Sequence, residues 1–358
     1  MRGLVLGFCG LLFAAPFVGC DSQPATKRFI FLINTPDPYW DTCNAGLKEG
    51  AKEFDLAGSG LSITMEPNTN KLQGQIDKLR QYATQSDVVG IAISPFEADA
   101  LALVEEMRKL QKKGVKVICV DADVNFKDAR PYYIGTNNKI AGENLGKATQ
   151  AILKAKGVDK GGYVQFVGST DNFNAKLRMD GFKEGVGSDY EELDRMPDGG
   201  GDITKAQTNV QNAIINQKEK LNCLVGIWAY NGPAIATVVK ELGKRDQYVS
   251  VTFDAAVDSI KTMENGGIDC LCVQQPFDMG LQAVRLLKAM HLNDEATLKE
   301  MFPNHGQPDG DVFTTGLRIV VPDEKSPVKS DLFDKNVVEF MTLPAFKEWL
   351  KKYKLTSS

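Results

Sequence analysis

One stretch of the chain, Val88–Asp123, contains a complete strand–loop–helix–strand unit and ends on acidic residues. Its first residues, VVGIAIS, form a continuous β-branched and apolar run, the kind that is buried on both faces of a sheet. A segment with apolar residues at helical spacing follows, and Gly114 ends it. A second apolar strand, VKVICV, leads directly to Asp121. This order predicts an α/β fold built on parallel strands.

The same order of elements occurs again from Leu224 to Ala256. Here Asn231 lies in the loop after the first strand, and Asp254 follows the second strand. Two such units predict two similar α/β lobes. Ligands of open parallel sheets bind outside the carboxyl ends of the strands, so Asp121, Asn231 and Asp254 are candidate site residues. An aspartate after a strand is also ordinary turn chemistry, but two in matching positions favour a site.

The composition excludes several classes of function. The 358 residues carry a net charge of −4 and show no basic stripe, which argues against nucleic acid as a partner. The sequence contains only two histidines and no hydrolase, phosphate-loop or metalloprotease motif. Asp121 and Asp254 could form a glycosidase pair, but no proton donor is apparent beside them. We therefore expect no enzymatic activity, no cofactor and no metal.

The first twenty residues are predicted to be an export signal. A short positive region at Arg2 precedes an apolar run that is too short for a comfortable membrane span. The run ends at Cys20, in a pattern that resembles a bacterial lipoprotein signal with Cys20 as the lipidated residue. A plain secretory signal with an incidental cysteine is the alternative. We expect residues 1–20 to be the signal, residues 21–27 to be a polar tether, and the protein to be periplasmic or on the cell surface, anchored through Cys20.

Five further cysteines follow the predicted signal, most of them in or beside apolar strands. No CxxC pair or nearby histidine completes a zinc pattern. They are interpreted as small buried hydrophobic residues, although an oxidising compartment would permit a disulfide.

The loop after the first predicted strand contains Asp37, Tyr39 and Trp40. Aromatic side chains at the carboxyl end of a strand can stack on the apolar faces of a sugar ring, and their O–H and N–H groups can donate hydrogen bonds. Equally, the two rings can simply pack the following helix against the sheet. Farther along, Asn174, Lys176 and Arg178 lie at the start of another predicted helix, with donors available to a ligand; a solvated helix end is the alternative for Lys176.

The last third of the chain is expected to contain a strand that ends on Gln274 and then a helix. A polar, glycine-rich loop is predicted from about His291 to Asp311. A late strand, VFTTGLRIVVPDE, and a basic amphipathic tail helix on the surface complete the chain.

Several of these segments together resemble the type I periplasmic binding proteins, specifically the ribose- and monosaccharide-binding group whose core is shared with lac-repressor-like regulators. The resemblance covers roughly Phe29 to Val321, and its motifs, in order, are INTPDPYWDTCNAGLKEGAKE, VICVDAD, NAKLRMDGF, YNGPAIATV, VTFDAAVDS and VQQPFDMG. It implies two Rossmann-like lobes with parallel sheets, joined by a three-strand hinge, with the ligand in the cleft between them. The expected lobes are residues 28–135 with 276–316, and residues 136–275 with 317–358 including the tail helix.

The resemblance also implies roles for individual residues. Asp37, Tyr39 and Trp40 match the polar residue and the two aromatics that contact the sugar ring. Asp121 matches the acid that accepts from sugar hydroxyls. The remaining expected ligand contacts are the basic residue of the second lobe, the polar pair of the repeated unit and the hinge-side amide: Arg178 (with Lys176 as the alternative), Asn231 and Asp254, and Gln274.

This chain departs from the ribose-binding pattern at the first loop and after the first acid. Asp37 stands where ribose binders carry Asn, and Tyr39 and Trp40 stand where they carry two Phe. Ala122 follows Asp121, where the pattern has Arg. The missing Arg removes a bidentate donor, so a larger sugar, a sugar alcohol or another polyol is expected in place of ribose.

The sequence thus predicts an exported solute-binding protein that captures a monosaccharide or polyol for an ABC-type importer. A monomer is expected, with an ABC permease in the membrane as its partner. The alternative is a sugar or polyol sensor subunit read by a chemoreceptor or sensor kinase. A transcription regulator would need a helix-turn-helix before the first strand, where the export signal is predicted in this chain.

Overall fold

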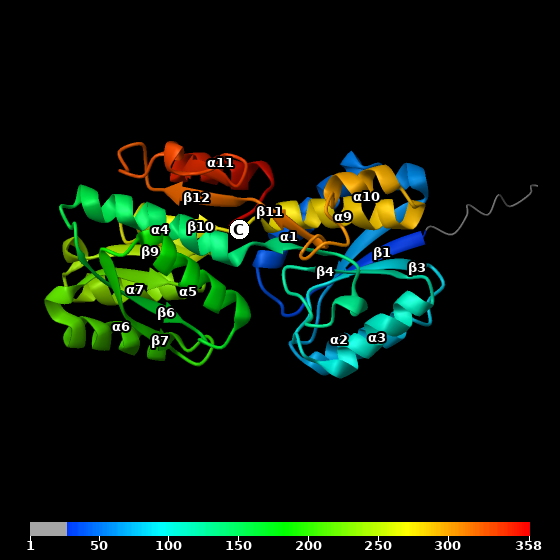
Figure 1. Ribbon diagram of the computed structural model, residues 1–358, viewed down its shortest axis with the longest axis horizontal. Coiled ribbons are helices and arrows are strands. Elements are labelled where there is room, and N and C mark those ends of the chain that lie inside the picture. The colour runs from blue at the N-terminus through cyan, green and yellow to red at the C-terminus, as the bar shows by residue number, and fades with distance from the viewer. Residues whose placement is uncertain (1–26) are drawn as a thin grey trace, which may run out of the picture.

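The computed structural model describes residues 27–358, which form two α/β lobes that lie side by side (Figure 1). The predicted signal, Cys20 and residues 21–26 of the predicted tether lie outside the described residues. The predicted fold class, two lobes with parallel-dominated sheets, is confirmed.

The first lobe is built on a six-stranded, entirely parallel sheet. Its strands, in spatial order, are β11 (Val312–Thr315), β5 (Tyr133–Thr136), β4 (Lys116–Val120), β3 (Val88–Ile93), β1 (Lys27–Leu32) and β2 (Leu61–Glu66). One face packs on α1 (Tyr39–Glu53), α9 (Pro276–Leu292) and α10 (Glu295–Met301), and the other on α2 (Leu72–Tyr82) and α3 (Leu101–Lys112).

The second lobe is built on a seven-stranded sheet in which only the β10–β12 pair is antiparallel. Its strands, in spatial order, are β13 (Val338–Thr342), β12 (Leu317–Val321), β10 (Cys270–Val273), β9 (Val249–Phe253), β8 (Leu221–Gly226), β6 (Gly161–Val167) and β7 (Tyr190–Pro197). Helices α4 (Asn138–Ala155) and α5 (Phe173–Val186) cover one face, while the other face carries α6 (Ile203–Gln217), α7 (Asn231–Glu241), α8 (Val257–Glu264) and α11 (Leu343–Lys352).

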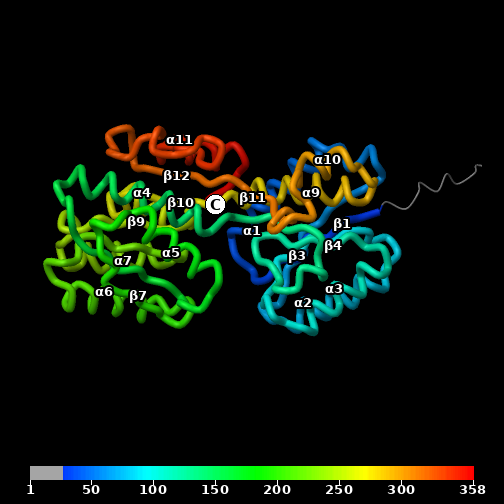
Figure 2. Tube along the Cα trace, in the orientation of Figure 1, coloured from blue at the N-terminus to red at the C-terminus, as the bar shows by residue number. Residues whose placement is uncertain are grey.

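The chain passes between the two sheets three times within the described residues: from β5 to α4, from β10 to α9, and from β11 to β12. The three connections lie together, since β5 and β11 are neighbours in one sheet and β10 and β12 are neighbours in the other. Figure 2 shows these three crossings as the segments that join the two lobes. The late strand expected to be continuous is therefore two strands in two different sheets, divided at Gly316.

In each lobe, one pair of helices packs closely through glycines. A Cβ on Gly46 of α1 would lie 1.8 Å from the carbonyl oxygen of Phe277 in α9. In the second lobe, a Cβ on Gly142 of α4 would lie 2.2 Å from the carbonyl oxygen of Arg178 in α5. Since α1 and α5 both carry candidate site residues, these glycines set where those residues lie. Gly146 lies in the same contact, since a Cβ there would be 2.6 Å from the carbonyl oxygen of Phe182 in α5.

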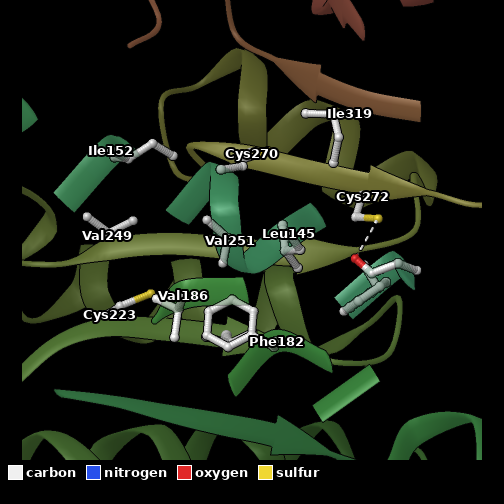
Figure 3. Packing of buried hydrophobic residues seen from close by; sticks show 14 of the residues in the cluster. Leu145, Ile152, Phe182, Val186, Cys223, Val249, Val251, Cys270, Cys272 and Ile319 are labelled. Atoms are coloured by element: carbon white, nitrogen blue, oxygen red, sulfur yellow. Dashed lines mark hydrogen bonds between the residues drawn. The ribbon is translucent and has the colours of Figure 1, made fainter. Parts of the chain in front are cut away.

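The described cysteines are all buried and free, in agreement with their interpretation as core residues. Figure 3 shows Cys223, Cys270 and Cys272 within the core of the second lobe, among Leu145, Phe182 and Val251. The Cys272 thiol points to the carbonyl oxygen of Ala141, at 3.6 Å. Burial raises the pKa of each of the five thiols.

The predicted loop from His291 to Asp311 is partly wrong. Helix α9 continues to Leu292, and α10 occupies Glu295–Met301. Asp294 caps α10, because its carboxylate accepts a hydrogen bond from the Thr297 amide at 3.1 Å. Only Met301 of this helix is buried, so its apolar pattern is weak in the sequence.

Within residues 27–358, none of the helices has the length and apolar character that a membrane span requires.

Candidate functional site

A cavity of about 510 Å³ lies where the carboxyl ends of strands from both sheets meet. This volume is within the range of small-molecule sites, about 300–1,000 Å³. Seven of the eight predicted ligand-binding residues line it: Asp37, Tyr39, Trp40, Asp121, Arg178, Asp254 and Gln274. The cavity therefore brings together segments that are far apart in the sequence and come from both lobes.

Tyr39 is placed by the start of α1. The Asp37 carboxylate accepts a hydrogen bond from the Tyr39 amide at 2.8 Å, which satisfies a free N–H group of the first turn. This bond orients the first turn, and the Tyr39 hydroxyl then donates to Asp121 Oδ1 at 3.0 Å. Burial, with a smaller contribution from Asp121, raises the pKa of Tyr39 well above its ordinary value, so the hydroxyl stays protonated and remains a donor.

Asp121 follows β4 directly, and two hydrogen bonds tie its backbone to the neighbouring strand β5. Its amide donates to the Ile134 carbonyl at 2.8 Å, and its own carbonyl accepts from the Tyr133 hydroxyl at 2.8 Å. Burial raises the pKa of its carboxyl from 3.8 to about 6; Tyr39 and Arg178 act in the opposite direction. The carboxylate is thus a fixed acceptor that is ionised at neutral pH.

The Trp40 side chain mainly packs helix α1 against the sheet. Its side chain is only 4% exposed and packs against Phe31, with ring centroids 5.7 Å apart. The Tyr39 ring stands edge-on to it at 5.0 Å. Of the two interpretations considered for this residue, packing of α1 against the sheet describes these contacts, and Trp40 is also among the residues that line the cavity.

Arg178, Asp254 and Gln274 form a network in the second lobe. Arg178 Nη1 lies 3.4 Å from Asp254 Oδ2, and Gln274 Nε2 donates to Asp254 Oδ1 at 3.1 Å. The network extends to the crossing after β5, because Asn138 Oδ1 accepts from Arg178 Nε at 2.9 Å and the Thr136 hydroxyl donates to Gln274 Oε1 at 2.9 Å. The arginine also lies over the Phe253 ring, 4.8 Å from its centroid. Every member of the network is therefore held in one orientation before a ligand arrives.

Asn231, the eighth predicted ligand contact, is not among the residues that line the cavity. It is fully buried at the start of α7. Its side-chain oxygen accepts from the Trp228 amide at 3.0 Å, and its Nδ2 donates to Asp198 at 3.1 Å. Both hydrogen bonds fix the loop after β8. Lys176, the alternative to Arg178, is exposed and also lies outside the lining.

The cavity includes residues that the sequence did not single out as ligand contacts. Trp228 lies two residues beyond β8, at the strand end, where the prediction favoured the polar Asn231 instead. Because Trp228 follows a buried strand, its place in the sequence could have identified it as a candidate ligand contact. The other additional lining residues come from the segments after β1, β6, β8 and β9 and from the end of the described chain: Asn34, Thr35, Pro38, Asn172, Ala229, Ala256, Val257, Asp258, Ser357 and Ser358. Asn174, which the sequence indicated as a donor available to a ligand, also lines the cavity.

The charge of the lining is negative. Among the described residues that line the cavity, four are aspartates and Arg178 is the one cation. Arg178 is already paired with Asp254. An anionic ligand would meet unfavourable potential here, whereas hydroxyl groups can donate to the carboxylates. The cavity fits a neutral ligand that is rich in hydroxyl groups.

No group of three or more histidine, cysteine, aspartate or glutamate side chains in residues 27–358 is arranged to hold a metal ion.

Comparisons with known proteins agree with this architecture. The model of the periplasmic binding protein domain family matches residues 29–295. A relative in Escherichia coli, a D-allose-binding periplasmic protein, is 22% identical over 278 residues, which are 74% of this chain and 84% of that protein.

Two solved structures show a similar fold. An ABC transporter solute-binding protein from Burkholderia graminis, in complex with D-arabinose, has a TM-score of 0.68 and 24% identity and covers 86% of this chain and 100% of its own. The sugar-binding protein of a sugar ABC transporter from Bacillus halodurans has a TM-score of 0.69 and 19% identity, over 83% and 97% of the two chains. The match to the family model spans most of the chain, which therefore belongs to the periplasmic binding protein domain family, as its resemblance to the type I, monosaccharide-binding members predicted.

Proposed function

We propose that this protein binds a neutral monosaccharide or a related polyol in the cavity between its lobes. The observation that carries the proposal is the pair Asp121 and Asp254, one carboxylate from each lobe, both lining one cavity beside aromatic side chains. A carboxylate has room for several hydrogen bonds, so each can accept from ligand hydroxyls in addition to its protein partners. Tyr39 and Trp228 offer ring surface on which the apolar face of a sugar can lie.

Binding is proposed to work by closure of the lobes. A ligand that contacts both lobes binds the closed form more tightly than the open form, and this difference shifts the population toward closure. We propose residues 28–135 with 276–316, and residues 136–275 with 317–358, as the two bodies that move. The crossings of the chain that lie together between the two sheets would serve as the hinge.

The site is also expected to discriminate between sugars that differ in the positions of their hydroxyl groups. Tyr39, Arg178 and Gln274 hold their partners in fixed positions. A ligand analogue without a matching hydroxyl leaves a buried polar group unpaired, which is the strongest basis for rejecting it. D-Allose and D-arabinose, the sugars named for two of the relatives, are the first candidates.

The protein is proposed to deliver its ligand to an ABC-type importer, because the two similar structures described above are named as the binding proteins of ABC transporters, in one case of a sugar transporter. The matched family is one of binding proteins and not of enzymes, and its name implies a periplasmic or extracellular location.

Lipid attachment at Cys20, a permease partner and a monomeric state belong to the same proposal. Replacing Cys20 with Ser should release the exported protein from the membrane fraction; persistent membrane association would contradict the lipid anchor.

The binding proposal can be tested by calorimetric titration of the purified protein with a panel of sugars. The panel contains D-allose, D-arabinose, D-xylose, D-glucose, D-galactose and neutral sugar alcohols, and the matched controls are the corresponding sugar acids and sugar phosphates. One or more neutral members should bind, while their anionic counterparts should not. Binding of the anionic members alone would contradict the account, as would no binding by any neutral member.

Transport can be separated from sensing in the living cell. Deletion of the gene should abolish uptake of the radiolabelled sugar that binds in vitro if the protein serves an importer. Unchanged uptake, with loss of a transcriptional or chemotactic response to that sugar, would favour the sensor alternative.

A further inference from the structure

The end of the described chain enters the candidate cavity. Helix α11 ends at Lys352, and Lys354 then adopts a left-handed conformation with φ 57°, which turns the chain back. The Leu355 amide donates to the Leu350 carbonyl at 2.9 Å and fixes this turn. Ser357 and Ser358 follow; both are about 95% buried and both line the cavity (6% and 5% exposed). Figure 1 marks this end between the two lobes.

This tail is held by both lobes. The Thr42 hydroxyl of α1, in the first lobe, donates to the Ser357 carbonyl at 2.8 Å. In the second lobe, Ala255 and Ser358 form two hydrogen bonds, since each donates its amide to the carbonyl of the other, at 2.9 and 3.1 Å. Ala255 directly follows Asp254, so the tail is fixed next to the central carboxylate of the site.

The side chain of Ser358 has no hydrogen-bond partner among the described residues. Its hydroxyl is buried and makes no hydrogen bond to any described group. A buried hydroxyl without a partner costs free energy, and in native structures such a group calls for an explanation. Here the hydroxyl belongs to a residue that lines the cavity, and rotation about χ1 to another staggered position is the movement that would bring it to a ligand.

We propose that Ser358 is a ligand contact that determines specificity: its hydroxyl hydrogen-bonds one hydroxyl group of the sugar or polyol. This inference rests on the proposed function and deepens it, because it assigns part of the site to a tail outside the matched family domain, residues 29–295. Thr42 and Ala255 are positioning residues that hold the tail in place. Relatives without such a tail would present a different wall to the ligand at this point.

The experiment compares the protein with its Ser358→Ala variant by calorimetric titration with the panel sugar that binds most tightly. The matched control is Thr356→Ala, because Thr356 lies on the same tail but is exposed and does not line the cavity. Ser358→Ala should weaken binding by about threefold to tenfold, as expected for one neutral hydrogen bond, and Thr356→Ala should leave it unchanged. Unchanged affinity of Ser358→Ala would overturn the inference.

A second set of titrations separates a direct contact from an effect on the tail's shape. Each monodeoxy analogue of the same sugar is titrated against the protein and against Ser358→Ala. One analogue, which lacks the hydroxyl that Ser358 contacts, should bind both proteins equally, while the others still bind the variant more weakly. Equal weakening with every analogue would overturn the contact. If no panel sugar binds the unmodified protein, the proposed function itself fails, and that result appears before any variant is measured.

Discussion

Asp121 and Asp254 occupy equivalent places in the two lobes and adopt the same left-handed backbone conformation, with φ values of 67° and 64°. Each follows a central strand, and each donates its amide to the neighbouring strand, Asp121 to the Ile134 carbonyl at 2.8 Å and Asp254 to the Cys272 carbonyl at 2.9 Å. Aspartate tolerates this conformation better than most residues, yet a non-glycine residue there still costs roughly 1–3 kcal/mol. This conformational cost occurs at both aspartates, one on each lobe's side of the cavity, as expected if both carboxylates are directed at a common ligand.

Asp254→Asn tests the second-lobe carboxylate. The amide keeps the shape of the side chain but removes the charge that pairs with Arg178 and accepts from ligand hydroxyls. Affinity for the best panel sugar should fall about tenfold to a hundredfold, since a hydrogen bond to a charged group contributes about 1.5–3 kcal/mol. Calorimetric titration measures this, with the exposed Asp246→Asn as control. Undiminished affinity would make Asp254 a turn residue only.

Asn231→Ala should act on stability more than on binding. It leaves the Trp228 amide and Asp198 each without one of their partners, so the free energy of unfolding should fall by about 1–3 kcal/mol. Thermal and denaturant unfolding measure the loss, with the exposed Asn336→Ala as control. Sugar affinity should fall far less than in Asp254→Asn. A variant with normal stability and no binding would instead restore Asn231 as a ligand contact.

Binding should weaken at acidic pH through Asp121. Burial raises the pKa of its carboxyl to about 6, so at pH 5 only about one molecule in ten carries the ionised acceptor. The apparent affinity should then be about tenfold lower at pH 5 than at pH 7, because only the ionised fraction binds well. Titrations across this range should show the change, and Asp121→Asn should remove it. A flat profile for the unmodified protein would contradict the assigned role.

The same carboxyl affects stability in the opposite direction. Its pKa is higher in the folded chain than the ordinary value of 3.8, so the folded form holds the proton more tightly. The contribution of Asp121 to the free energy of unfolding is therefore greatest below about pH 4, falls as the pH rises to about 6, and is constant above that.

Gly142→Ala should disturb the site from outside it. The added Cβ would lie 2.2 Å from the carbonyl oxygen of Arg178, so α5 would have to shift and carry the guanidinium with it. Overpacking of this kind costs about 1–3 kcal/mol, and sugar affinity should fall together with the melting temperature. Lys147→Ala, on the exposed face of the same helix, is the control. Unchanged melting temperature and affinity would show that the helix pair tolerates the separation.

Much of this architecture could be predicted from local patterns. The apolar runs at Val88–Ile93 and Leu221–Gly226 are central strands, and the aspartates after their neighbouring strands line the cavity. The pattern works because buried parallel strands need continuous apolar sequence, and because their carboxyl ends meet at one edge of the sheet.

The remainder depended on interactions that no local pattern reveals. Trp228 lies in the loop after β8, and Asn231 begins the helix that follows. Only the folded positions of Asp198 and the Trp228 amide show that the Asn231 side chain has protein partners, while Trp228 lines the cavity. Ser358 reaches the site only because the chain turns back at Lys354 and is held by Thr42 on the other lobe. Contacts between residues so far apart in the sequence leave no periodic pattern from which they could be predicted.

The central claim, that one neutral ligand is held by both lobes, is tested most directly by a crystal structure of the protein with its tightest-binding panel sugar. The account predicts the sugar between the lobes, with hydroxyls on Asp121 from one side and on Asp254 and Arg178 from the other. A sugar bound outside this cavity, or in contact with one lobe alone, would contradict it.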